Sequence, residues 1–359
     1  MTTRSTPGEA AAARGSLVEM ATGFARGKLL CAAVRLGIAD ALIRPMSVDH
    51  LAAEIDADPG ALGRLLRALA TIGILEGTAA DTYALTALGG PLRRDAPDSV
   101  WASVVFWADL LADQWTYLDE CVRAGEREGP ARARTAAGVS SRWAREPEAS
   151  AIFHAVFAEA GPEANLAYVE ACEISSARVV ADLGGAGGGL VSAILGAFPA
   201  LRGVLADRPE ALVAARERLA AAGLGDRCEL TACDLVETVP AGADVYLMRS
   251  VLHGYEDPAA TAILENCRAA IGAGGRLLVI ECVVPDRVQR ADPRVEAIAM
   301  GDLNMLAVTG GRERTRSEWE SLLARAGFEL VEVRPVGCDP ASGLASDQHS
   351  VIEARPAQA

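Results

Sequence analysis

The second half of the chain alternates between two periodicities, and this alternation limits the folds that it can adopt. From Ala177 onward, short β-branched and apolar runs alternate with segments whose apolar residues recur at helical spacing. The predicted strands are 179–183, 203–206, 229–231, 245–248, 277–280, 329–333 and 350–353, and the predicted helices are 189–197, 209–222, 258–271 and 317–326. Such a pattern requires a mainly parallel sheet covered by helices on both faces. No helix separates the last two runs, so the final strand can enter antiparallel.

The first half of the chain has helical periodicity from Gly15 to about Tyr168. Ser47 is expected to cap a helix over 48–55, and Asp58-Pro59 to begin a second helix that runs to residue 70. Two short strands at 72–75 and 83–86 would then complete the outline of a winged helix. The predicted divisions are a disordered tail over 1–14, a winged-helix-like domain over 15–100, linker and pocket helices over 101–176, and an α/β domain over 177–359.

Composition excludes several classes of protein. The net charge of −14 repels the phosphates of nucleic acids, so we expect no nucleic-acid partner. The sequence contains no apolar stretch of about 18 residues, and its first residues lack an apolar segment followed by a cleavage site. We therefore expect a cytoplasmic protein without a membrane partner. None of the eight cysteines forms a C-x-x-C pair, and no metal site is predicted.

A glycine-rich segment follows the first predicted strand of the α/β half, from Asp182 to Gly189. Glycines let the backbone turn sharply and approach a ligand closely, and the following helix offers free N–H groups. Asp207 and Asp234 follow the next two strands, so three acids lie at successive strand ends, where open α/β sheets bind ligands. These acids favour S-adenosylmethionine, with Asp207 placed for a ribose diol and Asp234 for an adenine amino group. A tight turn in the core, or a nicotinamide site, would use the same glycines.

His253 follows the fourth predicted strand, on the side of the sheet where a ligand would bind. A lone histidine is more often structural than catalytic, but this location favours a catalytic role. A phenol with a pKa of about 10 is a poor nucleophile at neutral pH, and an imidazole with a pKa of about 6.5 can take its proton. Such general-base catalysis is worth about 10²–10⁴ in rate.

Several segments now occur in an order that resembles a known family. They are Asp182–Gly188, Asp207, Cys233-Asp234, Leu252–Asp257, Leu278–Pro285, Asp302–Leu306 and Gly310–Thr315. Together they resemble the plant caffeic-acid-type O-methyltransferases and their bacterial natural-product relatives, over nearly the whole chain. The resemblance implies a Rossmann-like class I methyltransferase domain of α/β type, preceded by an all-α winged-helix domain that forms an intertwined homodimer.

The resemblance also implies roles for individual residues. His253 would deprotonate the acceptor hydroxyl, and Glu281 and Glu313 would flank and orient it. The implied S-adenosylmethionine site comprises Asp182, Gly184, Asp207, Asp234, Leu235 and Arg249. The implied acceptor contacts are Asp302, Asn304, Met305, Phe153 and Phe157, although core packing is an equal explanation for Met305 and the aromatic residues.

Four positions depart from the family pattern. Ala186 replaces the glycine usual in the middle of the loop and fits if its φ is negative. Leu235 stands where phenylalanine is common, and Gly254-Tyr255 replaces Asp-Trp after the histidine. The predicted reaction is therefore methylation of a hydroxyl on a small aromatic molecule of phenolic or polyketide type.

Three other functions stay open at this point. A relative with the same cofactor fold could carry out decarboxylation or hydroxylation instead of methylation. A nicotinamide-dependent oxidoreductase would share the glycine loop. A winged-helix regulator would use Arg64 and Arg67 on its reading helix, but that segment has no basic stripe.

Overall fold

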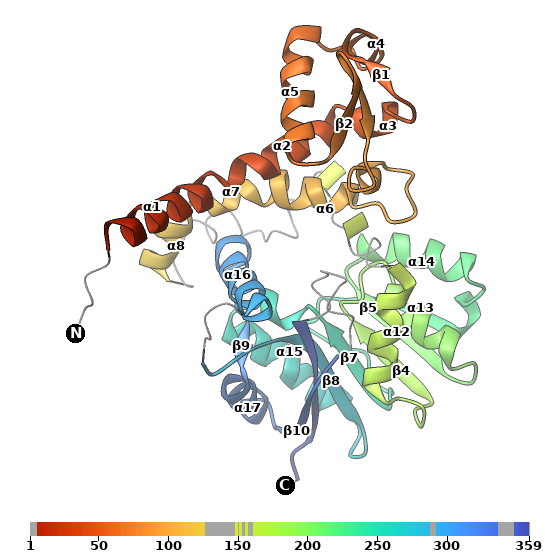
Figure 1. The fold of residues 1–359 in the computed structure, drawn as a ribbon. Coiled ribbons are helices and arrows are strands. Elements are labelled where there is room, and N and C mark those ends of the chain that lie inside the picture. Colours follow the sequence, from red (N-terminus) through yellow and green to blue (C-terminus); the bar gives the residue numbers. More distant parts are fainter. Residues whose placement is uncertain are drawn as a thin grey trace. The chain divides into compact units, whose positions relative to one another are not determined.

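The structure is a computed structural model that describes residues 6–125, 148, 149, 151, 152, 155, 156, 161–287, 292–336 and 348–358. The chain forms two compact units, one of residues 1–113 with 151–159 and one of residues 114–150 with 160–359 (Figure 1). Among the described residues, the helices lack the combination of length and apolar character that crossing a bilayer requires.

The first unit contains a small antiparallel sheet and the helices that pack on it. Its strands pair in the order β1-β3-β2. The elements are α1 (Pro7–Thr22), α2 (Phe24–Arg35), α3 (Ile38–Ala41), β1 (Met46–Ser47), α4 (Val48–Glu54), α5 (Pro59–Thr71), β2 (Leu75–Ala79) and β3 (Thr82–Leu85). Ser47 caps α4 and Asp58 caps α5 by accepting backbone N–H bonds, as predicted. The arrangement is a winged helix, with β1 as a strand that was not predicted.

Two predicted boundaries in the first unit are wrong. The strand expected over 72–75 begins only at Leu75, because Ile72 ends α5 as its C-cap. The tail expected to be disordered over 1–14 forms the first half of α1 from Pro7. Proline suits the first turn of a helix and the alanines at 10–13 have the highest helix propensity, so a helix here needs little tertiary support.

Short helical segments follow the wing. They are η1 (Gly90–Leu92), α6 (Trp101–Val105), a π-helical turn η2 (Phe106–Leu110), α7 (Ala112–Trp115) and α8 (Leu118–Ala124). Residues 101–124 thus form several short helical segments, and α12 (Gly161–Cys172) lies further along the chain.

The second unit contains a twisted sheet with strand order β10-β11-β8-β7-β4-β5-β6. The strands are β4 (Val179–Leu183), β5 (Arg202–Asp207), β6 (Cys228–Ala232), β7 (Val245–Arg249), β8 (Arg276–Val284), β10 (Phe328–Pro335) and β11 (His349–Pro356), and the short β9 (Arg314–Thr315) pairs in parallel with the end of β8. The pairs from β6 through β8 are parallel, whereas β11 is antiparallel to both of its neighbours, as predicted.

Helices cover both faces of this sheet. The helices are α13 (Gly189–Ala197), α14 (Ala211–Ala221), α15 (Asp257–Ala270), α16 (Pro293–Val308) and α17 (Arg316–Arg325), with 3₁₀ turns η3 (Gly225–Arg227) and η4 (Leu252–Gly254). Successive residues of β7 enter different cores: Tyr246 and Met248 pack with α15 and α17, and Leu247 packs with α12, α13 and α14. Because strand side chains alternate between faces, the continuous apolar run of β7 requires this double covering.

Candidate active site

His253 lies just beyond the carboxyl end of β7, in the turn η4. Between them, Ser250 has a left-handed backbone with a φ of 53° and donates its N–H to the carbonyl oxygen of Ile280, 3.0 Å away. A non-glycine residue in this conformation is strained and persists only where its surroundings hold it. The turn therefore leaves the sheet in a fixed direction and places His253 at the edge where parallel α/β sheets bind ligands.

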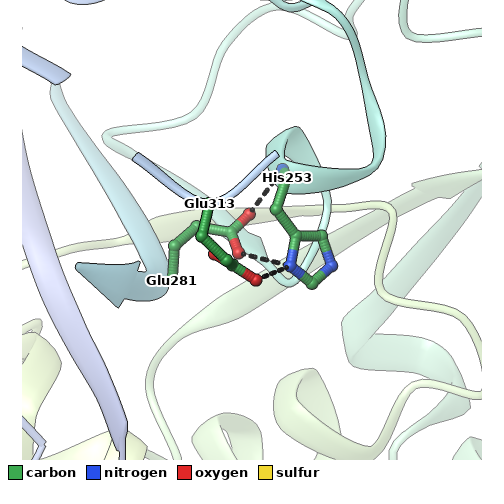
Figure 2. Close-up of side chains that lie close together, drawn as sticks. All are labelled: His253, Glu281 and Glu313. Carbon is green, nitrogen blue, oxygen red and sulfur yellow. Dashed lines mark hydrogen bonds and ion pairs between the residues drawn. The ribbon is translucent and has the colours of Figure 1, made fainter. Parts of the chain in front are cut away.

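Two carboxylates face one nitrogen of His253 (Figure 2). The Nδ1 atom lies 2.7 Å from Oε1 of Glu313 and 3.4 Å from Oε2 of Glu281. Glu281 comes from β8 and is fully buried, and Glu313 directly precedes β9 and is 5% exposed. The other ring nitrogen, Nε2, points away from both acids. The structure thus brings together the three residues predicted for catalysis.

The backbone around His253 is held from two sides. Oε1 of Glu281 accepts the N–H groups of Val251 and Leu252 at 2.9 Å and that of His253 at 3.3 Å. The N–H of Arg312 donates to the carbonyl oxygen of His253 at 2.8 Å. One carboxylate therefore serves both the main chain and the imidazole, which fixes the ring relative to the sheet.

The electrostatics of the cluster favour a proton on the imidazole. Burial alone would lower the pKa of His253, but the charge of Glu281 and the hydrogen bond and charge of Glu313 outweigh it and raise that pKa to about 9. Arg314 opposes this rise. Burial and the nearby Glu313 raise the pKa of Glu281. Both buried carboxylates therefore stabilise a proton on the imidazole.

A metal ion does not suit this cluster as it stands. The nitrogen of His253 and one oxygen from each glutamate lie within 4.8 Å of one another. However, ligand atoms about 2.0–2.2 Å from zinc in a tetrahedral site are more than 3 Å apart, and the 2.7 Å between His253 Nδ1 and Glu313 Oε1 is a direct hydrogen bond. The distance between the imidazole and the carboxylate thus fits a hydrogen bond rather than two ligands of one metal ion.

The three acceptor residues predicted on α16 differ in their contacts and burial. Asp302 accepts the N–H of Glu313 at 2.8 Å and so holds the backbone at that residue. Asn304 is buried, and its side-chain oxygen accepts the indole N–H of Trp115 at 3.1 Å. Met305 is half-buried. Phe153 and Phe157 lie outside the described residues.

The glycine-rich loop connects β4 to α13. Gly184 has a φ of 71°, and a Cβ atom there would come within 2.7 Å of the Val251 side chain. Ala186 also has a positive φ, 48°, so the expected negative φ is wrong. Its N–H donates to Oδ2 of Asp207 at 2.8 Å, which holds the loop in this shape. The loop therefore lies tightly against the turn that carries His253.

The three acids at the strand ends have different surroundings. Asp207 also accepts the N–H of Arg208 at 2.7 Å, and the exposed Asp234 accepts the N–H of Val236 at 2.9 Å. Asp182 is 1% exposed beneath the loop, where a Cβ on Gly185 would come within 2.5 Å of its Oδ2. Within the described parts of the chain that oxygen has no hydrogen-bond partner, and burial raises the pKa of Asp182 to about 6.

The remaining two residues predicted for the cofactor are also placed. Leu235 is buried in the core that α15 and α17 cover. Arg249 donates to the side-chain oxygen of Asn165 at 2.8 Å and lies over the ring of Tyr168. Leu235, which the family resemblance places in the cofactor site, can therefore offer a ligand only the small part of its side chain that is exposed.

The structure also brings together a group of polar residues next to Arg249 that was not predicted from the sequence. Tyr168 bonds through its hydroxyl to Nδ1 of His349 at 2.7 Å, and Nε2 of His349 lies 3.4 Å from Oγ of Ser250. Burial, followed by the charges of His253 and Arg249, lowers the pKa of His349 to about 3, so this imidazole is neutral. No sequence signal marks these residues, because helix α12 and strand β11 bring them together only through packing.

A winged-helix unit, a doubly covered sheet with this strand order and a glycine loop followed by acids at the strand ends define a class I S-adenosylmethionine-dependent methyltransferase. The O-methyltransferase domain family matches residues 115–329, and the O-methyltransferase dimerisation domain family matches residues 18–92. The chain belongs to the O-methyltransferase family, and S-adenosylmethionine is its cofactor.

Similar proteins span nearly the whole chain. Phenazine O-methyltransferase of Lysobacter antibioticus is 36% identical over 344 residues, covering 95% of each chain. O-demethylpuromycin-O-methyltransferase of Streptomyces alboniger is 36% identical over 358 residues, covering 98% of this chain and 92% of that one.

Solved structures agree with the fold. Mitomycin 7-O-methyltransferase superposes with a TM-score of 0.86 at 30% identity, covering 98% of this chain and 100% of that one. An O-methyltransferase from neocarzinostatin biosynthesis, solved with S-adenosylmethionine and 2-hydroxy-5-methyl naphthoic acid, has a TM-score of 0.77 at 26% identity and covers 92% and 96% of the two chains.

Proposed function

We propose that this chain methylates a hydroxyl group on a small, flat aromatic molecule, with His253 as general base. The observation that carries the proposal is the orientation of the imidazole. Its Nδ1 is bound to Glu313, so Nδ1 carries a proton and Nε2 is the atom that can accept one. Nε2 points away from the acids (Figure 2).

The proposed reaction divides simply between the cofactor and the protein. S-adenosylmethionine supplies a methyl group on a positively charged sulfur. The protein supplies the base: Nε2 of His253 takes the hydroxyl proton as the acceptor oxygen becomes the nucleophile. The carboxylates of Glu281 and Glu313 stabilise the imidazolium that results, and holding the oxygen in line with the methyl group provides the rest of the rate enhancement.

The cofactor site that we propose lies along the edge formed by β4, β5 and β6. Gly184 has no side chain to block a ligand from approaching the backbone. Asp207 offers an acceptor for ribose hydroxyls, and Asp234 offers one for an adenine amino group. Arg249, at the end of β7, would bound the site on that side. The unpaired Oδ2 of Asp182 is an anionic acceptor under the loop, which suits a cofactor that carries cationic groups.

The acceptor would bind over α16, the helix that carries Asp302, Asn304 and Met305. Of these three residues, Asp302 binds the N–H of Glu313 directly. Phe153 and Phe157 remain candidates for the pocket wall. The naphthoate in a related structure and the antibiotic relatives support an aromatic acceptor. A homodimer through the first unit is supported by the dimerisation family match and by exposed apolar side chains of Leu17, Met20 and Phe24.

The proposal is tested by His253→Ala. We expect turnover of a phenolic acceptor to fall by about 10²-fold or more, while calorimetry with S-adenosylhomocysteine gives an unchanged affinity. His50→Ala, which alters an exposed histidine of the first unit, is the matched control and should keep full activity. An active His253→Ala enzyme would remove the base from the mechanism.

The acceptor class needs a separate experiment. A panel of phenols, naphthoates and anthraquinones with methyl-labelled S-adenosylmethionine would identify it, with mass analysis to establish a gain of one methyl group. Products that lose a carboxyl group or gain oxygen would instead assign the chain to the relatives that have exchanged methylation for another reaction.

A further inference from the structure

The segment from Gly311 to Arg314 lies along the backbone of the turn that carries His253. The N–H of Arg312 donates to the carbonyl oxygen of His253 at 2.8 Å. The guanidinium of Arg314 donates to the carbonyl oxygens of Leu252 at 3.1 Å and Tyr255 at 3.0 Å. Three carbonyl groups of one turn are thus bound by a single short segment.

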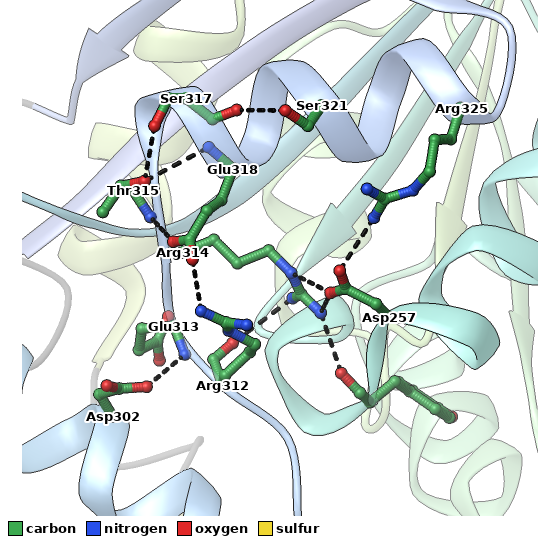
Figure 3. Close-up of polar contacts among 11 residues, drawn as sticks. Asp257, Asp302, Arg312, Glu313, Arg314, Thr315, Ser317, Glu318, Ser321 and Arg325 are labelled. Carbon is green, nitrogen blue, oxygen red and sulfur yellow. Dashed lines mark hydrogen bonds and ion pairs between the residues drawn. The ribbon is translucent and has the colours of Figure 1, made fainter. Parts of the chain in front are cut away.

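Arg314 is unusually placed for a charged residue, because its side chain is only 1% exposed. Its Nε and Nη2 donate to Oδ1 of Asp257 at 3.1 and 2.9 Å (Figure 3). Its guanidinium lies 5.3 Å from the centre of the Trp319 ring. A planar fork with five N–H groups can satisfy a carboxylate and two carbonyls at once, which a lysine ammonium cannot do with the same geometry. The desolvated charge is therefore held by partners on all sides.

Glu313 and Arg314 are consecutive at the start of β9, and their side chains reach different parts of the same histidine turn. Glu313 binds the imidazole, and Arg314 binds the main chain on either side of it. Asp302 holds the N–H of Glu313 from α16, as Figure 3 also shows. A displacement of this segment would therefore move the ring and its partner acid together.

We propose that Arg314 is a positioning residue for catalysis, which fixes His253 by clamping the turn Leu252–Tyr255 to the segment that carries Glu313. The proposal rests on His253 being the base. Arg314 touches neither cofactor nor acceptor in this role. It sets where Nε2 points, and a misplacement of about 1 Å in such a group can cost about 10²-fold in rate.

The test uses Arg314→Lys, which keeps the charge but loses the fork. We expect kcat to fall by about tenfold or more, with KM for the acceptor and affinity for S-adenosylhomocysteine each changed less than about twofold. Arg325→Ala is the matched control, because the exposed Arg325 binds the other oxygen of Asp257 at 2.9 Å and reaches no carbonyl of the turn. It should retain wild-type kcat. An Arg314→Lys enzyme with wild-type kcat would overturn the proposal.

A double-mutant cycle separates the clamp from the base. If Arg314 acts through His253, adding Arg314→Lys to His253→Ala lowers kcat no further; a full additional tenfold loss would overturn the clamp. A His253→Ala enzyme of wild-type rate would instead refute the base itself. If Arg314→Lys does not fold, Asp257→Asn weakens the anchor of the guanidinium at a half-exposed position, and the same cycle applies. If Asp257→Asn lowers kcat by the same factor in the wild-type enzyme and in the His253→Ala enzyme, the clamp is overturned.

Discussion

Acidic side chains have different partners on the two halves of the sheet edge. On the β7–β8–β9 side, the carboxylates of Glu281 and Glu313 bind the histidine turn and its imidazole. On the β4–β5–β6 side, Asp207 binds the N–H of Ala186 in the glycine loop, and the exposed Asp234 binds the N–H of Val236 in its own loop. The first arrangement fixes the orientation of an imidazole, and the second fixes the shape of two loops.

This difference predicts where substitutions act. On the histidine side, buried Glu281 and Arg314 bind the backbone of the turn that carries the ring, so small displacements should change turnover more than binding. On the glycine-loop side, the acids and the backbone are in place for contacts with a ligand. Substitutions there should change cofactor affinity or local stability more than the chemical step.

The largest expected effect on this comparison comes from Gly311→Ala. A Cβ at this position would clash with the carbonyl oxygen of His253 and lie 2.7 Å from the carbonyl carbon of Gly254, so the backbone must move. We expect kcat to fall by about 10²-fold with cofactor affinity unchanged, as measured by steady-state kinetics and calorimetry.

The control for that change is Gly254→Ala in the neighbouring turn, where an added Cβ meets open space. It should retain kcat within about twofold, because it adds a methyl group without displacing the backbone. If Gly311→Ala lost cofactor affinity instead of turnover, the two halves of the edge would not be functionally separate.

Glu281→Gln should give a smaller effect, visible in the pH dependence. With a pKa of about 9, only about one His253 in a hundred is neutral at pH 7, so the wild-type kcat/KM should rise with pH up to that value. Removing the charge of Glu281 lowers the pKa of His253, because one of the two carboxylates that favour imidazolium is gone. The rising limb should therefore move to lower pH.

The interpretation of that profile depends on the other groups that act on His253. Glu313 remains and still raises its pKa, Arg314 lowers it, and His349 is neutral over this range. Glu320→Gln, an exposed acid of α17 that pairs with Arg316, is the control and should leave the profile unchanged. If the rising part of the kcat/KM profile does not move in Glu281→Gln, the group that titrates in this range is not His253.

Much of the fold was predictable because local signals agreed with the tertiary structure. The strand at 179–183 and the helix at 189–197 match β4 and α13 at every residue, since a β-branched run, a glycine turn and an apolar helix follow one another directly. Helix α16 was missed although Asp292-Pro293 is the same start signal that identified α5. Its apolar residues do not gather on one face, so periodicity alone could not find it.

The site was predictable in its residues but not in its contacts. His253 and Glu313 are 60 residues apart, and only a family resemblance linked them before the structure placed their atoms 2.7 Å apart. Arg314 belonged to a recognised motif, yet no spacing rule predicts that its side chain binds the carbonyl of Leu252. The burial of Leu235 and the contacts of His349 likewise depend on packing between distant elements.

The smallest expected effect is at Ala186, on the glycine-loop side. Its φ of 48° costs an L-residue about 1 kcal/mol relative to glycine, while glycine loses more backbone entropy on folding, about 0.5–1 kcal/mol. The two terms nearly offset, so Ala186→Gly should change the thermal midpoint by no more than about 2 °C. Ala220→Gly, at an exposed position within helix α14, is the control and should destabilise by about 1 kcal/mol, because no strain is relieved there. Turnover should be unchanged in both. If Ala186→Gly were as destabilising as Ala220→Gly, the positive φ of Ala186 would cost too little to offset the backbone entropy that glycine loses on folding.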